Sequence, residues 1–291
     1  FTIGLRFDPT VVEIPVGRLS VYTPDEVLAY LAKVQALESQ TPGVWMKNIL
    51  HFAGGFDPGE TGGFVNYLNG LKAVAVDTSF GGSVSTFRKS SSETFQSASA
   101  DSVRTLIQEG VTLMTFLAHA YASSFDITID DPVNYQWNGK HPLVIGNSCY
   151  IGNIHQNNRL SQGEGWVLAP NTGPIGFLAT TELASAPYLM DYSNAFYRSF
   201  SRVNHGKGIG EHMKYAVNQV MQNSYNLNTL HTAHTFTLQG DPTIVLNSFD
   251  KPDYAVSDED VYYDPSPVTA DADTFQVKAV ITNIGKAING P

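Results

Sequence analysis

Two apolar segments that do not alternate in polarity constrain the fold of this chain more than any other feature. They are residues 111–118 (VTLMTFLA) and residues 142–146 (PLVIG), each followed by polar or glycine residues. Continuous apolar runs of this length are typical of strands buried on both faces of a parallel sheet. His119 follows the first strand, and Cys149, the only cysteine, follows the second. Because chemistry in open α/β sheets collects beyond the carboxyl ends of strands, the two residues are candidates for a cysteine nucleophile and its proton carrier.

The rest of the chain up to residue 247 alternates between helical and strand patterns. A helix is predicted to begin at residues 23–26 (TPDE), where Thr23 and Glu26 make a capping box and Pro24 suits the first helical position. Its apolar stripe is predicted to face the core: Val27, Leu28, Leu31, Val34 and Leu37. Further strands are expected at residues 11–21, 48–53, 83–87, 173–179 and 243–246, and further helices at residues 60–71, 100–108, 161–169, 188–202 and 209–222. This alternation predicts a doubly wound α/β sheet with helices on both faces.

Composition narrows the functional classes. The net charge is −10 and Lys and Arg form no cluster, so the basic surface that nucleic-acid binding requires is missing. No apolar stretch approaches the ~20 residues of a transmembrane helix, so no segment of this sequence is expected to span a membrane. Because the sequence starts at Phe1 and stops at Pro291, we expect it to be a piece of a longer protein.

Residues 123–142 form a long connection with three acidic residues, Asp126, Asp130 and Asp131. Three interpretations are open: a solvated loop, a calcium site, because hard cations take several carboxylate oxygens, or one wall of a substrate pocket. We expect no required cofactor, and calcium is the one metal that the sequence suggests. His231 and His234 are three residues apart but lack further ligands in motif spacing, so they do not predict a zinc site.

The composition changes after residue 247. Residues 248–267 are rich in Asp, Pro and Tyr, which is typical of a linker, and residues 275–282 begin with the alternation of a half-buried strand. The predicted division is therefore a catalytic domain over residues 1–247, and a linker with the start of a β-domain over residues 248–291. A chain ending near Ser248 should fold by itself.

Short motifs around both candidate residues resemble those of the gingipain family of cysteine peptidases. LAHAY at residues 117–121 and GNSCYIG at residues 146–152 resemble the paired catalytic motifs of that family. The type IX secretion system sortase branch is more similar still, on four further motifs: LHFAGG (50–55), FDITIDDP (125–132), NIHQ (153–156) and LQGDP (238–242). The resemblance covers roughly residues 11–247. One difference is that Ala118 and Ala120 flank the histidine, where the family usually has Gly or Ser.

The resemblance implies a caspase/gingipain-like, mostly parallel sheet with helices on both faces, followed by the start of an immunoglobulin-like β-domain. It implies a cysteine endopeptidase that works through a thioester, with Cys149 as nucleophile and His119 as proton carrier. The backbone N–H groups of Cys149 and Ala120 are the expected oxyanion donors. Two flanking loops supply the expected substrate-binding residues: Tyr121, Asp126, Thr180, Thr181 and Glu182. A polypeptide substrate, secretion-system components as partners, and a place outside the cell or on the bacterial cell surface are further expectations.

Two alternatives remain open at the level of sequence. If water resolves the thioester the enzyme is a protease, and if an amine resolves it the enzyme is a sortase-like transpeptidase. The other alternative is a non-catalytic scaffold or binding domain that retains the peptidase fold, because fold does not imply function. Ala118, Ala120 and Tyr121 favour that alternative, because a Cβ crowds the close backbone approach that glycine permits.

Overall fold

A seven-stranded sheet forms the centre of the protein. The computed structural model describes residues 2–3, 12–91, 93–94, 96–98, 100–121, 124–155, 161–223, 226–249 and 251–287. The strand order is β3-β13-β12-β11-β7-β4-β5. Their bounds are β3 Gly17–Arg18, β4 Asn48–Ala53, β5 Ser83–Arg88, β7 Leu113–Leu117, β11 Leu143–Asn147, β12 Gly176–Thr180 and β13 Phe236–Gly240. All neighbours are parallel except β12 and β13, so the mostly parallel α/β sheet predicted from the sequence is confirmed.

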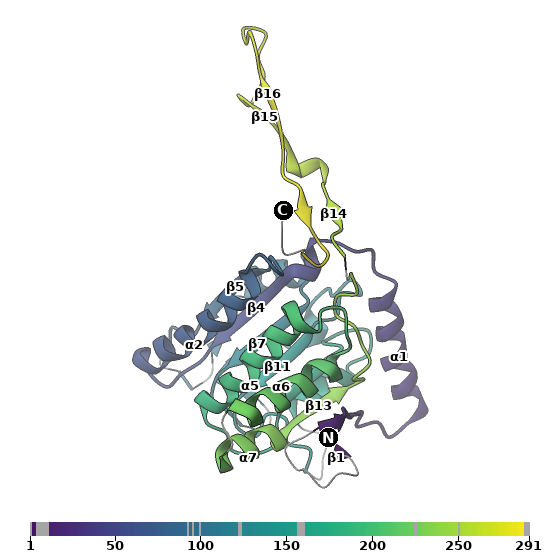
Figure 1. The fold of residues 1–291 in the computed structure, drawn as a ribbon, viewed down its shortest axis with the longest axis vertical. Helices are drawn as coiled ribbons and strands as arrows, with labels where there is room; N and C mark the ends of the chain where they lie inside the picture. Colours follow the sequence, from purple (N-terminus) through teal and green to yellow (C-terminus); the bar gives the residue numbers. More distant parts are fainter. Residues whose placement is uncertain are drawn as a thin grey trace.

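Helices cover the sheet in two layers. They are α1 Pro24–Glu38, α2 Pro58–Val76, α3 Ala100–Glu109, α4 Gln162–Leu168, α5 Ala186–Arg198, α6 Ile209–Asn223 and α7 Leu227–Thr235, and a π-helical turn, Ser199–Val203, continues α5. Helices α2, α6 and α7 all pack against α5 on one face of the sheet (Figure 1). Helices α1 and α4 pack against each other. Short strands lie in the connections: β1 Thr2–Ile3, β2 Val12–Ile14, β6 Gln96–Ser97, β8 Ala120–Tyr121, β9 Ser124–Phe125 and β10 Ile127–Thr128.

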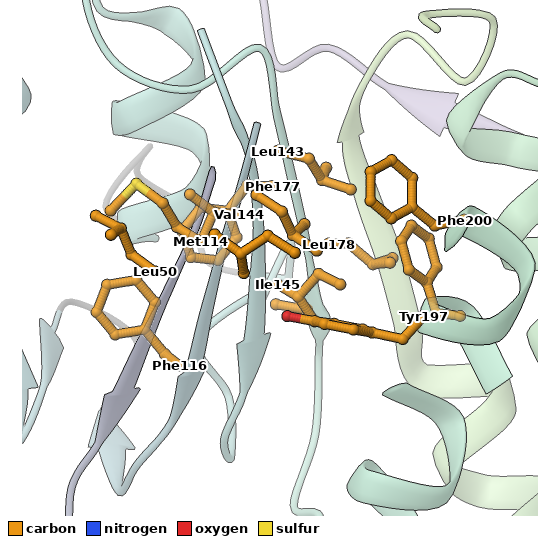
Figure 2. Packing of buried hydrophobic residues seen from close by; sticks show 14 of the residues in the cluster. Leu50, Met114, Phe116, Leu143, Val144, Ile145, Phe177, Leu178, Tyr197 and Phe200 are labelled. Carbon is orange, nitrogen blue, oxygen red and sulfur yellow. The ribbon is translucent and has the colours of Figure 1, made fainter. Parts of the chain in front are cut away.

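The core lies on both faces of the central strands, as the unbroken apolar runs predict. Every residue of β7, β11 and β12 is buried. Figure 2 shows Met114 and Phe116 of β7 among these side chains, with Tyr197 and Phe200 approaching from the helical layer. The Phe116 ring stacks on both Phe52 and Phe125, with centroids 4.4 Å apart in each pair. Dense packing of this kind fixes the strand ends, and with them the loops that follow.

The register of β7 and β11 brings the two candidate residues together. Leu117 pairs with Asn147 at the ends of these parallel strands. His119 and Cys149 each follow two residues later, so they lie at equivalent positions beyond one edge of the sheet. Odd-numbered positions face the α5 layer, because the hydroxyl of Thr115 on β7 lies 2.7 Å from Tyr197 Oη and Asn147 Oδ1 on β11 accepts a bond from Ser193. The chain order therefore places both residues at the edge where chemistry is expected.

The buried side of α1 differs from the predicted stripe. The capping box is confirmed, since the Thr23 side chain accepts from the Glu26 N–H and the Glu26 side chain accepts from the Thr23 N–H. The residues that α1 buries are Tyr30, Lys33 and Leu37, while the predicted Val27, Leu28 and Leu31 are exposed. Lys33 is buried because its ammonium donates to the carbonyls of Val167 and Pro174, both at 2.8 Å. Burial lowers the pKa of Lys33 to about 7. Hydrophobic spacing alone could not foresee a buried lysine with two backbone partners.

The last strand of the sheet also differs from the prediction. Residues 243–246 were expected to form it after the LQGDP turn, but the strand is β13, which precedes the turn and runs antiparallel to β12. The helix before it, α7, was not predicted, and it contains the two histidines that suggested zinc. The helix explains their spacing, because residues three apart share a face of any helix.

Residues beyond 250 form a projection from the α/β unit (Figure 1). It contains β14 Tyr254–Ala255, a 3₁₀ turn Asp258–Asp260, β15 Val261–Asp264, β16 Gln276–Ala279 and β17 Thr282–Asn283, in two small antiparallel sheets. The segment predicted to be a linker, residues 248–267, contains a strand, because residues 261–264 pair with β16. The base of the projection is attached to the α/β unit, since Lys47 Nζ donates to Gly285 O at 2.7 Å. The immunoglobulin-like identity of this part stays a prediction.

No helix among the described residues combines the length and hydrophobicity needed to cross a membrane.

Candidate active site

His119 lies against the beginning of α2, the helix that follows β4. Its Nε2 is 2.9 Å from Glu60 Oε1, close enough for an ion pair, although the N–H direction does not suit a linear hydrogen bond. The Phe56 ring stacks on the imidazole with centroids 3.7 Å apart and planes 8° apart, and Phe64 contacts it at 5.7 Å. Because β4 and β7 are parallel neighbours, the first turn of α2 starts beside the end of β7. The imidazole is thus positioned by a carboxylate and two aromatic rings.

Cys149 lies against the loop after β12. Its Sγ is 3.3 Å from the carbonyl oxygen of Ala184 and 3.4 Å from the N–H of the same residue. The next residue, Tyr150, has φ of 56°, a left-handed conformation that is strained for an aromatic residue and is found preferentially at functional sites. The Tyr150 N–H donates to Glu182 O at 3.0 Å and holds this conformation in place. In this arrangement the thiol donates to a backbone carbonyl, and no hydrogen bond joins it to His119 within the described residues.

Both side chains contact segments that belong to one helical layer. His119 contacts the first turns of α2, and Cys149 contacts the residues that lead into α5, and these two helices pack against each other on one face. In this conformation the thiol is hydrogen-bonded to the carbonyl oxygen of Ala184.

The backbone of Ala120 has an orientation suited to an oxyanion donor. In the β8–β9 hairpin Ala120 is opposite Phe125, and the hydrogen bond beside this pair runs from Asp126 N to His119 O at 2.8 Å. Ala120 therefore occupies a position at which its own N–H points away from the partner strand. The N–H of Cys149 has no acceptor among the described residues. Two unused backbone donors thus follow the two central strands.

The loop after β12 presents one of its three expected substrate-binding side chains. Thr180 is fully buried and its hydroxyl donates to the carbonyl oxygen of Ser148, which ties this loop to the residue before the cysteine. Thr181 is also buried, and its N–H donates to Thr235 O at 3.0 Å. Glu182 is half-exposed. Direct contact with a ligand would fall to Glu182, while the two threonines support the loop. The side chain of Tyr121 lies outside the described part of the chain.

Asp126 is a structural residue at this edge of the sheet. Its side chain is 5% exposed, and Oδ2 accepts from the Gly55 N–H at 2.9 Å and lies 3.4 Å from Lys89 Nζ, which is itself 3% exposed. This buried ion pair joins the end of β5 to the β8–β9 hairpin. The carboxylate is not open to a substrate in this conformation, contrary to the expectation that Asp126 lines the pocket.

The other two acidic residues of the loop have separate partners. Asp130 lies 3.5 Å from an Arg104 guanidinium nitrogen, and Asp131 caps the 3₁₀ turn Pro132–Asn134 by accepting from the Val133 N–H. Within the described ranges, no three His, Cys, Asp or Glu side chains are grouped so that they could hold a metal ion. The calcium site stays a prediction.

Sequence reasoning missed Glu60, Phe56 and Lys89. A signal for Glu60 was present, because Asp57, Pro58 and Glu60 have the spacing of a helix start directly after a predicted buried strand. The structure shows that cap, with the Asp57 carboxylate accepting from the N–H groups of Gly59 and Glu60. A helix start at that point places Glu60 at the same sheet edge as His119. No local sequence pattern predicts the stacking of Phe56 on His119 or the ion pair of Lys89 with Asp126.

Known proteins share the sequence family and the fold of this chain. A family model described as Peptidase family C25 matches residues 4–247, whereas no curated protein matches the chain. The solved structure of the Arg-specific cysteine proteinase gingipain R is similar with a TM-score of 0.67 at 14% identity, covering 94% of this chain and 63% of that one. A complex of Porphyromonas gingivalis RgpB pro- and mature domains gives 0.67 at 15% identity, covering 92% and 63%. This chain thus spans under two thirds of those proteins. At such low identity they establish the caspase-like α/β fold alone. Because the family model covers most of the sequence, the chain belongs to peptidase family C25, the gingipain family of cysteine peptidases.

Proposed function

We propose that this protein is a cysteine endopeptidase in which Cys149 is the nucleophile and His119 is the general acid and base. The observation that carries the proposal is the shared position of the two residues, each two residues beyond paired ends of adjacent parallel strands. Membership of a cysteine peptidase family and the nearby Glu60 carboxylate support the same roles.

The reaction follows from these positions. The Cys149 thiolate attacks the peptide carbonyl carbon, and the resulting oxyanion accepts hydrogen bonds from the N–H groups of Cys149 and Ala120. Protonated His119 gives its proton to the amine as the C–N bond breaks, which leaves a thioester. Water then loses a proton to His119 as its oxygen bonds to the carbonyl carbon, and the C–S bond breaks to return the thiolate. Loss of one oxyanion donor typically costs ~10²–10³ in rate, so the Ala120 N–H is an important part of the site.

An active-site probe tests the proposal directly. A peptidyl acyloxymethyl ketone should alkylate Cys149, and mass spectrometry of the digested protein should locate the adduct. Cys149→Ala should abolish both labelling and peptide turnover, and His119→Ala should reduce turnover nearly as far because members of one catalytic unit are not additive. Unchanged circular dichroism of both variants is the control. Labelling of Cys149 that is absent, or that does not depend on His119, would support the scaffold alternative instead.

The peptidase could take one of two more specific forms, which differ in the nucleophile that attacks the thioester. A sortase-like transpeptidase of the type IX secretion system would transfer the acyl group to an amine, and a protease would transfer it to water. Turnover in the presence of glycine amide distinguishes them, because mass spectrometry of the products shows whether the acyl group forms mainly the free acid, as for a protease, or mainly the new amide, as for a transpeptidase. We propose a location outside the cell or on the bacterial cell surface, in keeping with the family, with secreted polypeptides as substrates and secretion-system components as partners.

Calcium binding is a separate proposal that rests on the acidic residues 126–131. Thermal melts with calcium and with a chelator test it, because a ligand that prefers the folded state raises the melting temperature. Identical melting temperatures with calcium and with the chelator would contradict this proposal.

A further inference from the structure

A cavity of about 1120 Å³ opens on the His119 side of the candidate site. It is lined by the beginning of α2, including Gly62 and Gly63, and by the end of β5 with the residues that follow it, including Arg88 and Lys89. Phe56, whose ring stacks on His119, forms the rim next to the site. We call this space the α2–β5 cavity. It adjoins the imidazole and is separate from the residues that contact Cys149.

The charge open to a ligand in the α2–β5 cavity is that of Arg88. Its side chain is exposed, and no acidic side chain lies within ion-pair distance of it in the described part of the chain. Lys89 already pairs with Asp126, and the one acidic residue in the lining, Asp57, uses its carboxylate to cap α2. A group that enters the cavity therefore meets an unpaired guanidinium, which binds carboxylates with good geometry.

Gly62 and Gly63 in the lining have no steric role within the fold. A Cβ added at Gly62 or Gly63 would have no atom within 4 Å, whereas one added at Gly54 would lie 2.0 Å from Asp126 Oδ1. Glycine inside a helix is destabilising by roughly 0.5–1 kcal/mol relative to alanine. The two glycines thus weaken α2 but leave the cavity free of side chains at these positions. A peptide backbone needs such space in order to approach the helix closely.

The order of the strands tells which part of a substrate would reach this cavity. Along the sheet edge the parallel strands run β5, β4, β7, β11 and β12, so the sequence of features is Arg88, Phe56, His119, Cys149 and the loop after β12. His119 protonates the departing amine, so the chain on the C-terminal side of the cleaved bond leaves on the histidine side of the cysteine. Three strand spacings separate β11 from β5, or ~14 Å, which an extended peptide spans in about four residues.

We propose that the α2–β5 cavity binds the polypeptide on the C-terminal side of the cleaved bond, and that Arg88 selects Asp or Glu within about four residues of that bond. The proposal rests on the peptidase function for the direction of the chain. The cavity, the unpaired Arg88 and the open face of α2 are independent of it.

Cleavage profiling of a peptide library tests the selectivity. After digestion of the library by the wild-type protein, mass spectrometry gives the residues that follow each cut, and Asp and Glu should be enriched several-fold at one of the second to fourth positions. Arg88→Ala should remove this enrichment, and Arg88→Glu should replace it with Lys and Arg. Arg198→Glu, which changes an exposed arginine on α5, is the matched control and should keep the wild-type profile. A profile that is the same with Arg88→Glu as with the wild type would overturn the proposal.

A binding measurement separates the cavity from the catalysis. Cys149→Ala protein is titrated with fluorescein-labelled decapeptide pools that are random at six positions and carry either Glu or Gln at the last four. The Glu pool should bind about tenfold tighter, a difference of ~1.4 kcal/mol that is lost with Arg88→Ala. If wild-type protein cleaves peptides but the pools bind equally, the cavity assignment fails and the peptidase function stands. If Cys149 is inert yet the Glu pool binds through Arg88, the peptidase function fails and the cavity assignment stands.

Filling the cavity distinguishes binding from stability. Gly62→Leu adds a good helix former in open space, so the melting temperature should stay the same or rise while binding of both pools weakens several-fold. Gly70→Leu is the matched control, because Gly70 lies on the same helix with no atom within 4 Å of an added Cβ but outside the cavity. The melting temperature of Gly70→Leu should change in the same direction as that of Gly62→Leu, and its peptide binding should be the same as that of the wild type. Equal binding by both variants would contradict occupation of the cavity.

Discussion

At the scale of single residues, the site depends on groups that hold His119 rather than on the histidine and cysteine alone. Glu60 Oε1 lies 2.9 Å from Nε2, and Oε2 of the same carboxylate accepts from the Phe56 N–H at 2.7 Å. One side chain therefore connects the imidazole to the aromatic ring that stacks on it. In the proposed mechanism, the negative charge of Glu60 would stabilise the protonated form of His119.

Glu60→Gln should lower kcat by about tenfold to a hundredfold, less than the ~10²–10⁴ that general acid–base catalysis contributes as a whole. The amide oxygen can still accept from Phe56, so KM and the melting temperature should change little. Steady-state kinetics with the best peptide measures this, and Glu211→Gln on the exposed side of α6 is the control. A fall in melting temperature that parallels the loss of activity would show that Glu60 is structural.

Gly54 illustrates how tightly the edge of the sheet is packed. Gly54→Ala would place a Cβ 2.0 Å from Asp126 Oδ1 and 2.9 Å from Ala118 Cβ, so backbone must move. We expect a loss of about 2–4 kcal/mol in the free energy of unfolding, measured by urea denaturation. Gly70→Ala on α2 should instead gain up to ~1 kcal/mol, because nothing opposes its Cβ. A loss below 1 kcal/mol at position 54 would show that this edge can relax.

At the scale of elements, the hairpin that follows His119 is fixed by the buried pair of Lys89 and Asp126. Lys89→Met leaves a buried carboxylate without its cation and should cost about 3–5 kcal/mol in the free energy of unfolding. Adding Asp126→Asn removes the unpaired charge and keeps an acceptor for the Gly55 N–H, so the double variant should be more stable than Lys89→Met alone. Strictly additive losses in a double-mutant cycle would contradict this. Arg104→Met, which breaks the more exposed pairs of Arg104 with Asp101 and Asp130, should cost under ~1 kcal/mol.

At the scale of the whole molecule, buried histidines make the fold sensitive to acid. Burial lowers the pKa of His51 to about 3, of His212 to about 3 and of His141 to about 4. The unfolded chain takes up these protons near pH 6.5, so each histidine favours folding above that pH and its contribution is lost as the pH falls toward 3 or 4. The maximal slope is about 1.4 kcal/mol per pH unit for each histidine.

The free energy of unfolding should therefore fall steadily between pH 6.5 and 4.5, measured by urea denaturation at each pH. The free energy of unfolding of His51→Gln should fall less steeply with decreasing pH. This variant should be less stable at pH 7, because the hydrogen bond between His51 Nε2 and Tyr197 Oη, 2.9 Å long, is altered. A stability that is constant over this range would show that other groups compensate for the histidines.

The projection beyond residue 250 adds stability without completing the sheet. A chain shortened to end at Ser248 loses Ile284, which is 4% exposed, and the carbonyl of Gly285 that accepts from Lys47. Lys47 keeps Phe80 O at 2.7 Å as an acceptor. We expect the shortened chain to unfold cooperatively, with a free energy of unfolding that is lower by about 1–3 kcal/mol. Circular dichroism measures this transition. Loss of the transition altogether would show that the projection is part of the folding unit.

The sequence by itself predicted which segments become the central strands, and it identified His119 and Cys149 as the candidate dyad. The unbroken apolar runs before His119 and Cys149 are typical of buried parallel strands, and parallel neighbours bring the residues that follow them to the same edge of the sheet. The capping pattern at Thr23 likewise defined a helix start, because these signals act between residues three or four apart in the chain.

Tertiary structure alone decided which neighbours surround those residues. The stacking of Phe56 on His119, the pairing of Lys89 with Asp126 and the burial of Lys33 all join segments far apart in sequence, and no local spacing encodes them. The same reason explains why the last strand of the sheet is predicted one turn too late, since β13 pairs with β12 although three helices separate them in the chain. Local patterns fix what a segment becomes, whereas the partner of a buried charge or the ring beside an imidazole depends on how distant segments pack.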